Sequence, residues 1–376
     1  MTATAETAVA APPAGHAKGG PSLAGWLVRG VLLLPLVYFF LSVIPGSADL
    51  TERGTEWVVF ALVGISLNII IGYTGQLSLG HQGFVGVGAF AAAYSLTVHQ
   101  VPFALSIILA IVVGGLFAML IGFAALRITG LYLSLITLVF GITLEQSLFQ
   151  QPDLTNGGAG QPAYKPDALI EPSRYYFFCL AILVVIVFID WRLTSTKAGR
   201  ALFALRENER VAAAFGINVT AYKLLAFVMS GAIAGLAGAL FAFKSEQVTG
   251  EDYDFFLALT FVLMVVVGGL NSRFGVLVGA FLFSRIGLDY AIERFHWIHE
   301  LLVEGFLFVP GFGEERIQFA PRLIGAFLLL LTLLQFPGGI AQQLRPFTRW
   351  FAGGPFSFKH DVDGGPGTVE GSSVRA

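Results

Sequence analysis

Six polar side chains stand close together in a part of the sequence that is otherwise apolar and rich in glycine. They are Asn68, Thr74, Gln76, Ser78, His81 and Gln82. Their amide, hydroxyl and imidazole groups donate and accept hydrogen bonds, and unwound backbone beside Gly72, Gly75 and Gly80 would add N–H and C=O groups for a zwitterion. We predict that they line a translocation path. The alternative is hydrogen bonding between helices that only fixes packing, the more ordinary role of a lone membrane histidine such as His81.

A second candidate is an amphipathic segment, residues 196–218. Good helix formers run from Arg200 to Phe215, and Gly216 is a plausible stop, so we predict one short helix. Its apolar ridge and its charges are suited to a groove on a partner protein. The predicted contact residues are Arg200, Phe203, Arg206, Glu207, Glu209, Arg210, Phe215 and Gly216. Composition alone equally favours a helix that lies at the lipid interface.

Patterns typical of enzymes and of bound cofactors are not found in this sequence. No stretch matches the phosphate-binding G-x-x-x-x-G-K-[ST] pattern, and no Ser/His/Asp or Cys/His constellation can be recovered. The single cysteine, Cys179, excludes an intramolecular disulfide and a Cys-rich metal site. Glu293, His296, His299, Glu300 and Glu304 recur at helical spacing, a pattern that could bind a metal, but they lack a zincin spacing. We therefore predict no catalytic residue, no metal and no cofactor, and we expect no nucleic-acid partner.

The elements that must position these residues are transmembrane helices. Hydrophobic residues make up 56% of the chain, charged residues only 12%, and the mean hydropathy is +0.77, whereas a soluble protein carries about 25% charged residues. Runs of about 20 apolar residues recur along the chain. We predict an all-α membrane bundle of about ten spans, or nine because Arg285 weakens the ninth: 26–44, 57–71, 77–96, 102–126, 131–149, 175–189, 224–243, 255–270, 274–292 and 323–336. The glycines of 77–96 predict a broken or closely packed helix.

Basic residues set the predicted orientation. Alternate threading places about twice as many Lys and Arg on the side of the amino terminus as on the other, so both termini are predicted to be cytoplasmic. The predicted organisation has a disordered cytoplasmic tail (1–22), a permease domain (23–345) and a largely disordered cytoplasmic tail (346–376). Within the domain, 190–223 is a cytoplasmic coupling segment and 289–320 a periplasmic one. The lipid bilayer of a bacterial inner membrane is the expected surrounding.

Several stretches carry a family resemblance. They are LNIIIGYTGQLSLGHQGF (67–84), GRALFALRENERVAAAFGINVTAYKLLAF (199–227), SGAIAGLAGAL (230–240), VGGLNSRFG (267–275) and LQFPGGI (334–340). Together they resemble the LivH/LivM-type permeases of branched-chain amino acid ABC importers, and the sequence looks closer to LivM. The resemblance covers most of residues 57–340. The segment 289–320 is longer and more aromatic than such permeases lead us to expect.

The resemblance implies a function and a set of partners. The chain would be a transport subunit rather than an enzyme, paired with a second homologous permease, two cytoplasmic ATPase subunits and a periplasmic substrate-binding protein, with 200–216 as the coupling element. Substrate would be leucine, isoleucine or valine, imported by alternating access. A related importer for urea, short amides or other amino acids stays open. So does an ion-coupled secondary transporter, for which Glu145 is the one serious intramembrane acid.

Overall fold

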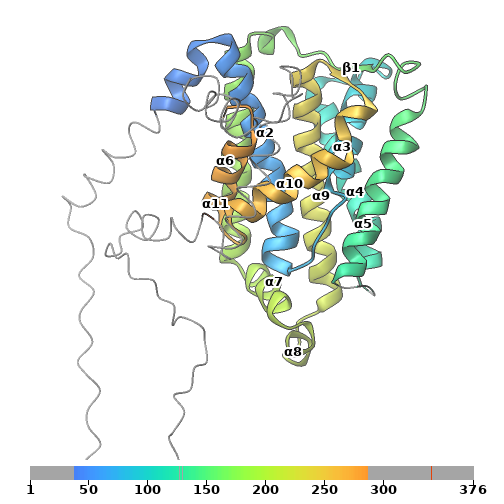
Figure 1. Ribbon diagram of the computed structural model, residues 1–376, viewed down its shortest axis with the longest axis vertical. Helices are drawn as coiled ribbons and strands as arrows, with labels where there is room; N and C mark the ends of the chain where they lie inside the picture. The colour runs from blue at the N-terminus through green and yellow to red at the C-terminus, as the bar shows by residue number, and fades with distance from the viewer. Residues whose placement is uncertain (1–37, 127, 129, 287–339, 341–376) are drawn as a thin grey trace, which may run out of the picture. The chain divides into compact units, whose positions relative to one another are not determined.

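The computed structural model describes residues 38–126, 128, 130–286 and 340, all within one unit of the chain, Tyr38–Leu344. This part is mostly helical (Figure 1). The helices are α2 (Ala48–Asn68), α3 (His81–Thr97), α4 (Phe103–Ala125), α5 (Leu131–Gln146), α6 (Pro172–Ser195), α7 (Lys197–Glu207), α8 (Glu209–Ala214), α9 (Val219–Ser245), α10 (Phe255–Gly268) and α11 (Arg273–Phe283). Two-residue strands β1 (Gln161–Pro162) and β2 (Gln247–Val248) pair antiparallel.

Five helical stretches are long and apolar enough to cross a membrane. They are Ala48–Tyr73, Phe103–Ala124, Leu131–Gln150, Pro172–Ser195 and Val219–Ser245. They coincide with five of the predicted runs, which confirms a multi-pass helical membrane protein. In the predicted eighth and ninth runs, α10 and α11 have only 14 and 11 residues. The described residues therefore do not establish ten spans. Residues 26–37 of the first predicted run, the run 323–336, both tails and 289–320 lie outside them.

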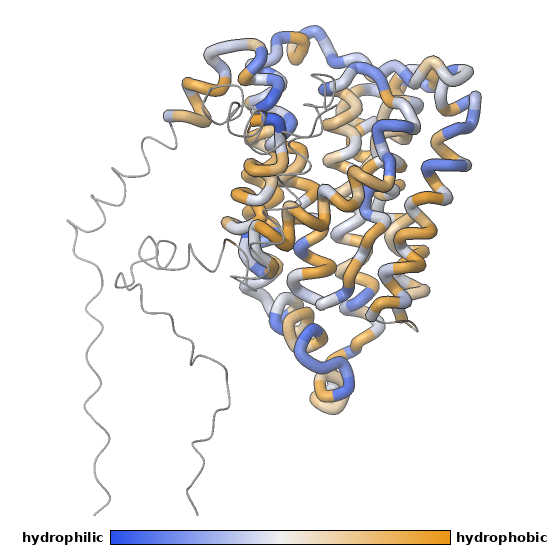
Figure 2. The backbone as a smooth tube through the Cα atoms, viewed as in Figure 1, coloured by the Kyte–Doolittle hydropathy of each residue, from blue (hydrophilic) through white to orange (hydrophobic). Residues whose placement is uncertain are grey.

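The hydropathy of the bundle changes along the helices. Figure 2 shows apolar backbone through the middle of the bundle and hydrophilic stretches at its two ends, including the tip that carries α7 and α8. Since a bilayer has an apolar interior between two polar interfaces, this pattern fits helices that cross it. At the end opposite α7, the β1–β2 pair joins the loop before α6 to the loop after α9 (Figure 1).

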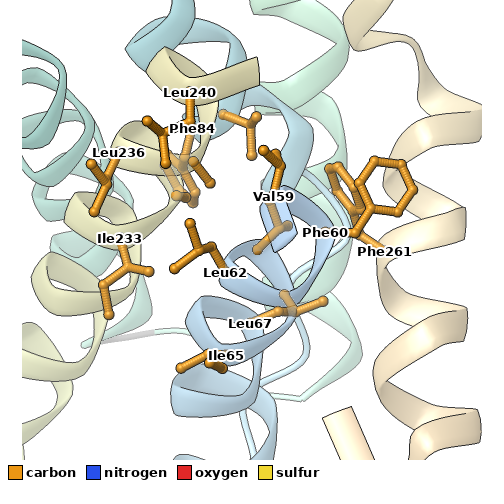
Figure 3. Packing of buried hydrophobic residues seen from close by; sticks show 14 of the residues in the cluster. Val59, Phe60, Leu62, Ile65, Leu67, Phe84, Ile233, Leu236, Leu240 and Phe261 are labelled. Atoms are coloured by element: carbon orange, nitrogen blue, oxygen red, sulfur yellow. The ribbon is translucent and has the colours of Figure 1, made fainter. Parts of the chain in front are cut away.

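Helix α2 is the centre of the described bundle. Its apolar window is fully buried within the structure, whereas 28% of the α5 window and 28% of the α6 window are buried. Figure 3 shows α2 side chains meeting α9 on one side and α10 on the other. Phe60 meets Phe261 edge-on, with ring centroids 5.5 Å apart. Helix α2 is therefore packed between neighbouring helices, which fixes the position of the residues that follow its end.

Glycines bring α3, α4 and α9 into close contact. A Cβ added to Gly88 would overlap the backbone of Gly235, and one added to Gly114 would lie 2.5 Å from the carbonyl oxygen of Gly231. Without a hydrophobic driving force in lipid, such small residues allow van der Waals packing between helix backbones. These three helices form the rigid frame on which the interrupted third segment is built.

Candidate functional site

The predicted interruption lies between α2 and α3. α2 continues into a π-helical turn, Ile69–Tyr73, after which residues 75–80 are not helical and α3 begins at His81. Gly75 has φ +70°, a conformation that favours glycine. Figure 1 shows this coil running from the α7 end of α2 back into the bundle before α3 starts. In the third predicted run, 77–96, residues 77–80 are therefore not helical and the rest belongs to α3, so the run is broken near its start, as its glycines predict.

Three of the predicted path residues make hydrogen bonds in the bundle. The Asn68 side chain accepts from the backbone N–H of Asn271 at 2.9 Å. The hydroxyl of Thr74 donates to the carbonyl of Ile70 at 2.6 Å. His81 is fully buried, and its Nε2 lies 2.7 Å from the hydroxyl of Ser66. The bonds of Asn68 and His81 join separate segments of the bundle, and the bond of Thr74 lies within its own helical turn.

The histidine belongs to a small interhelical network that the sequence analysis missed. Ser66 Oγ donates to the backbone carbonyl of Ser230 at 2.7 Å, and Ser230 Oγ donates to the carbonyl of Ser66 at 2.7 Å. Because the Ser66 proton is used in this way, we assign the proton of His81 to Nε2. The Nδ1 atom is then an acceptor, and no partner for it is found in the described residues.

The other three path residues are buried without partners. Gln76, Ser78 and Gln82 are 4%, 0% and 0% exposed. Within the described part of the chain, neither side-chain amide nor the Ser78 hydroxyl makes a hydrogen bond. More than 90% of buried polar groups in proteins are paired, and each unpaired one costs about 1–3 kcal/mol. These three side chains therefore offer hydrogen-bonding groups that the described residues do not satisfy.

Helix α5 covers the interruption. Its Thr137 hydroxyl accepts a hydrogen bond from the backbone N–H of Leu79 at 3.0 Å. A Cβ added to Gly80 would overlap the carbonyl of Thr137, and one added to Gly141 would lie 2.5 Å from the Nε2 of Gln82. Neither Thr137 nor Gly141 was singled out from sequence, since both look like ordinary residues of an apolar span.

The coupling segment is two helices, and the predicted single helix over 200–216 is wrong. Asn208 lies between α7 and α8 with extended backbone (φ −162°, ψ 112°), and its side chain accepts from the N–H groups of Arg210 and Val211. An asparagine that caps in this way competes with the continuous helix. The predicted stop is correct: Gly216, at φ +79°, follows the end of α8.

Three of the predicted contact residues also touch the bundle, and one of them, Arg206, is exposed as well. The Phe203 ring meets Tyr73 edge-on, with centroids 5.2 Å apart. Arg206 Nη1 donates to the carbonyl of Gly72 at 2.7 Å. Glu209 forms a 2.8 Å ion pair with the buried Lys223 of α9. The remaining predicted residues, Arg200, Glu207, Arg210, Phe215 and Gly216, are exposed.

Tyr73, which contacts Phe203 of α7, also contacts an ion pair between α6 and α11. Its hydroxyl donates to Asp190 Oδ2 on α6 at 2.9 Å, and Asp190 also pairs with Arg273 at the start of α11. Arg273 reaches Thr194 as well. The coupling segment, the end of α2, α6 and α11 are thus linked at one end of the bundle. Asp190 lies at the end of an apolar run, which is the signal that would have identified it.

The described residues contain no group of three or more His, Cys, Asp or Glu side chains able to hold a metal ion. The glutamates and histidines between 293 and 304 lie outside those residues.

Residues 55–309 match a protein family described as "Branched-chain amino acid transport system / permease component". The chain belongs to this family. The matched stretch includes both the interruption and the coupling segment, so the resemblance seen in those motifs is confirmed.

Two proteins named LivM are similar to this chain, in agreement with the family match. The chain is 31% identical over 283 residues to the high-affinity branched-chain amino acid transport system permease protein LivM of Salmonella typhimurium, covering 68% of this chain and 66% of that protein. It is 29% identical over 280 residues to LivM of Escherichia coli, covering 67% and 65%. The match thus spans about two thirds of each LivM protein or slightly less.

A galactose/methyl galactoside import permease protein, MglC of Salmonella typhimurium, is 25% identical over 334 residues, 79% of this chain and 96% of that one. No solved structure matches the chain.

Proposed function

We propose that this permease is the transmembrane subunit of an ATP-driven importer that moves leucine, isoleucine and valine into the cytoplasm. The observation that carries the proposal is the family match across the interrupted third segment and the coupling segment together. Relatives named LivM support the cargo. The chain itself is a transport subunit and not an enzyme, and ATP is hydrolysed in separate chains.

The proposed assembly contains a second homologous permease, two cytoplasmic ATPase subunits and a periplasmic substrate-binding protein. It lies in a bacterial inner membrane, with both termini and the segment 190–223 in the cytoplasm and 289–320 in the periplasm. Permease domain 23–345 would hold the full set of about ten spans. Two observations support a location in the membrane. Five of the described helical stretches are long and apolar enough to span it, and the backbone through the middle of the bundle is apolar (Figure 2).

The proposed path follows the interruption. Gln76, Ser78 and Gln82 have free hydrogen-bonding groups there, and the non-helical backbone of residues 75–80 adds others. We assign Asn68, Thr74 and His81 to the walls of this path, since their bonds to Asn271, Ile70 and Ser66 hold the ends of the interruption in place. Alternating access requires that α5 or its neighbours move away from the interruption in one state.

Coupling would run from the exposed side of α8 to the buried side of α7. Phe215 is 83% exposed at the tip of the bundle, a position suited to an ATPase groove. On the other side, Arg206 and Phe203 contact Gly72 and Tyr73, directly before the interruption. A displacement of α7 by ATP binding would therefore reach the path through one hydrogen bond and one aromatic contact. Arg200, Glu207, Arg210 and Gly216 complete the exposed docking face.

Relatives with a different cargo define the second candidate. The MglC protein is named for galactose and methyl galactoside import, so the membrane scaffold of the family serves more than one substrate class. An importer of another small polar molecule, including urea or short amides, would use the same helices and the same coupling segment.

Uptake in cells from which the gene for this chain has been deleted tests the cargo. Radiolabelled leucine, isoleucine and valine should enter much more slowly than in the parent cells, and a plasmid copy of the full chain should restore the rates. Galactose and urea serve as the comparison substrates. Unchanged entry of all three amino acids together with lost entry of another substrate would overturn the branched-chain assignment and retain the importer.

A further inference from the structure

The start of α3 carries hydrogen-bond donors that its own helix does not use. Gly80 precedes the helix and provides no side-chain cap. The first N–H groups of an α-helix have no i−4 partner within it; here the N–H of Gly83 donates to the carbonyl of Gly80 at 3.1 Å, which leaves the N–H groups of His81 and Gln82 for a ligand. The aligned peptide dipoles give this end a partial positive charge. α3 is 17 residues long, so this charge is fully developed. By itself a helix start is common, and a second feature is needed to make it a site.

Gln82 supplies that second feature. A Cβ placed on Gly141 would lie 3.0 Å from the Cα of Gly80 and 2.5 Å from the Nε2 of Gln82. The Gln82 amide is therefore beside the residue that begins α3. It is completely buried, and neither its nitrogen nor its oxygen has a partner in the described residues. Ser78, two residues before Gly80, is also fully buried with an unpaired hydroxyl.

The local charge favours an anion over a cation. Residues 69–83 contain no Asp, Glu, Lys or Arg, so no carboxylate of this segment can hold an ammonium group. Helix donors, an amide and a hydroxyl form a set that stabilises negative charge.

Helix α5 closes the place where a ligand would lie. The N–H of Leu79 donates to the Thr137 hydroxyl of α5, so an acceptor from a neighbouring helix stands at the start of α3. Most of the α5 window is not buried within this unit, with only 28% covered. If α5 moves, a ligand can replace the Thr137 hydroxyl as the acceptor for the N–H of Leu79.

We infer that the start of α3, with the Gln82 amide and the Ser78 hydroxyl, binds the carboxylate of the amino acid during transport and that α5 covers this subsite between transport events. The inference rests on the proposed function and deepens it, because it assigns one end of a zwitterion to named atoms. The side chain of the substrate would then extend along the non-helical residues 75–80.

Charged thiol reagents test the subsite in the purified transporter reconstituted in liposomes. Cys179 is the only cysteine of this chain and is buried, so a Cys179→Ala background removes its single native thiol, and labelling is measured on this chain alone. Ser78→Cys, a nearly isosteric change that breaks no hydrogen bond, and Gln82→Cys introduce separate probes. During ATP turnover, each variant is treated with anionic sulfonatoethyl methanethiosulfonate or cationic trimethylammonioethyl methanethiosulfonate. Ser106→Cys is the matched control, because Ser106 is equally buried but its hydroxyl bonds within α4.

At positions 78 and 82 the anionic reagent should react about fivefold faster than the cationic one, a ratio equivalent to a helix-dipole interaction of about 1 kcal/mol. Leucine should slow this reaction, and leucinamide, which lacks the carboxylate, should not. Ser106→Cys should not react with either reagent. Equal or reversed charge preference at both positions, or no protection by leucine while leucine uptake continues, would overturn the subsite and leave the importer intact. A wrong cargo assignment would be detected in a different experiment: leucine would still enter cells that lack this chain.

Discussion

At the scale of single residues, the interruption between α2 and α3 combines two kinds of buried polar group. His81 and Asn68 are bonded to neighbouring helices, whereas Gln76, Ser78 and Gln82 are buried without partners in the described chain. Bonded groups hold the interruption in shape. Unbonded groups lower the stability of this state, which is expected where a site must stay available for a substrate.

Gln82→Leu should therefore stabilise the protein and impair it. Removing an unpaired buried amide should raise the free energy of unfolding by about 1 kcal/mol. Leucine uptake should fall about tenfold, equivalent to about 1.4 kcal/mol. Thermal unfolding in detergent and uptake by complemented cells measure the two effects. Ser66→Ala is the comparison, because Ser66 bonds His81 and Ser230 and its loss should lower stability. A destabilised Gln82→Leu variant with normal uptake would show that the amide is structural.

Arg206 should act in coupling and not in docking. Its guanidinium donates to the carbonyl of Gly72, so Arg206→Ala should lower the number of leucine molecules imported per ATP hydrolysed by about tenfold, the equivalent of a charge-assisted hydrogen bond of about 1.5 kcal/mol. Arg206→Lys should keep part of the coupling, and the exposed Arg192→Ala should keep all of it. The ratio is measured in proteoliposomes. If Arg206→Ala instead releases the ATPase subunits, the residue belongs to the docking face.

Sequence alone identified the polar residues of the interruption but not their partners. Ser66 and Ser230 are 164 positions apart, and each looks like an ordinary small residue of an apolar run. Arg206 is exposed, as its charge predicts, but its hydrogen bond to the carbonyl of Gly72 could not be read from the sequence. Residue type predicts which groups need a partner; only the packing of distant helices shows which of them have one.

At the scale of elements, backbone contact between α4 and α9 is tested by two neighbouring glycines. The Cβ of an alanine at 114 would lie 2.5 Å from the carbonyl of Gly231, and that of an alanine at 115 would lie 3.5 Å from the carbonyl of Val228. Gly114→Ala should lower the free energy of unfolding by about 2 kcal/mol. Gly115→Ala should be neutral or stabilise by up to about 1 kcal/mol. Thermal unfolding compares them; equal effects would contradict this helix packing.

The exposed side of α8 predicts a second effect. Phe215→Ala should weaken retention of the ATPase subunits about thirtyfold, since loss of a central aromatic anchor costs about 2 kcal/mol. Thermal stability of the permease should not change, because this side chain is 83% exposed. Tyr164→Ala, 64% exposed at the other end of the bundle, is the control. Retained ATPase subunits in Phe215→Ala, measured by affinity purification, would exclude α8 from the docking face.

Hydropathy predicted the positions of the long helices better than the places where helices are divided. The apolar runs at 57–71, 102–126, 131–149, 175–189 and 224–243 all coincide with helical stretches long and apolar enough to cross a membrane. The division of the coupling segment at Asn208 was missed because its neighbours are good helix formers. Its side chain caps α8, and helix propensity does not contain that local competition.

At the scale of the whole molecule, the central claim is that an ATPase outside this chain moves the interruption through α7. Family membership and the contacts of Arg206 and Phe203 with the end of α2 support it. The family was predictable from motifs, whereas the contact of α7 with Gly72 joins residues 134 positions apart and required the fold.

The most direct measurement is leucine import by liposomes that contain the complex purified through a tag on this chain. We predict that two ATPase subunits co-elute and that import requires ATP on the side of α7 and α8, with no requirement for an ion gradient. Import that proceeds without any ATPase and follows a proton or sodium gradient would contradict the account and identify a secondary transporter.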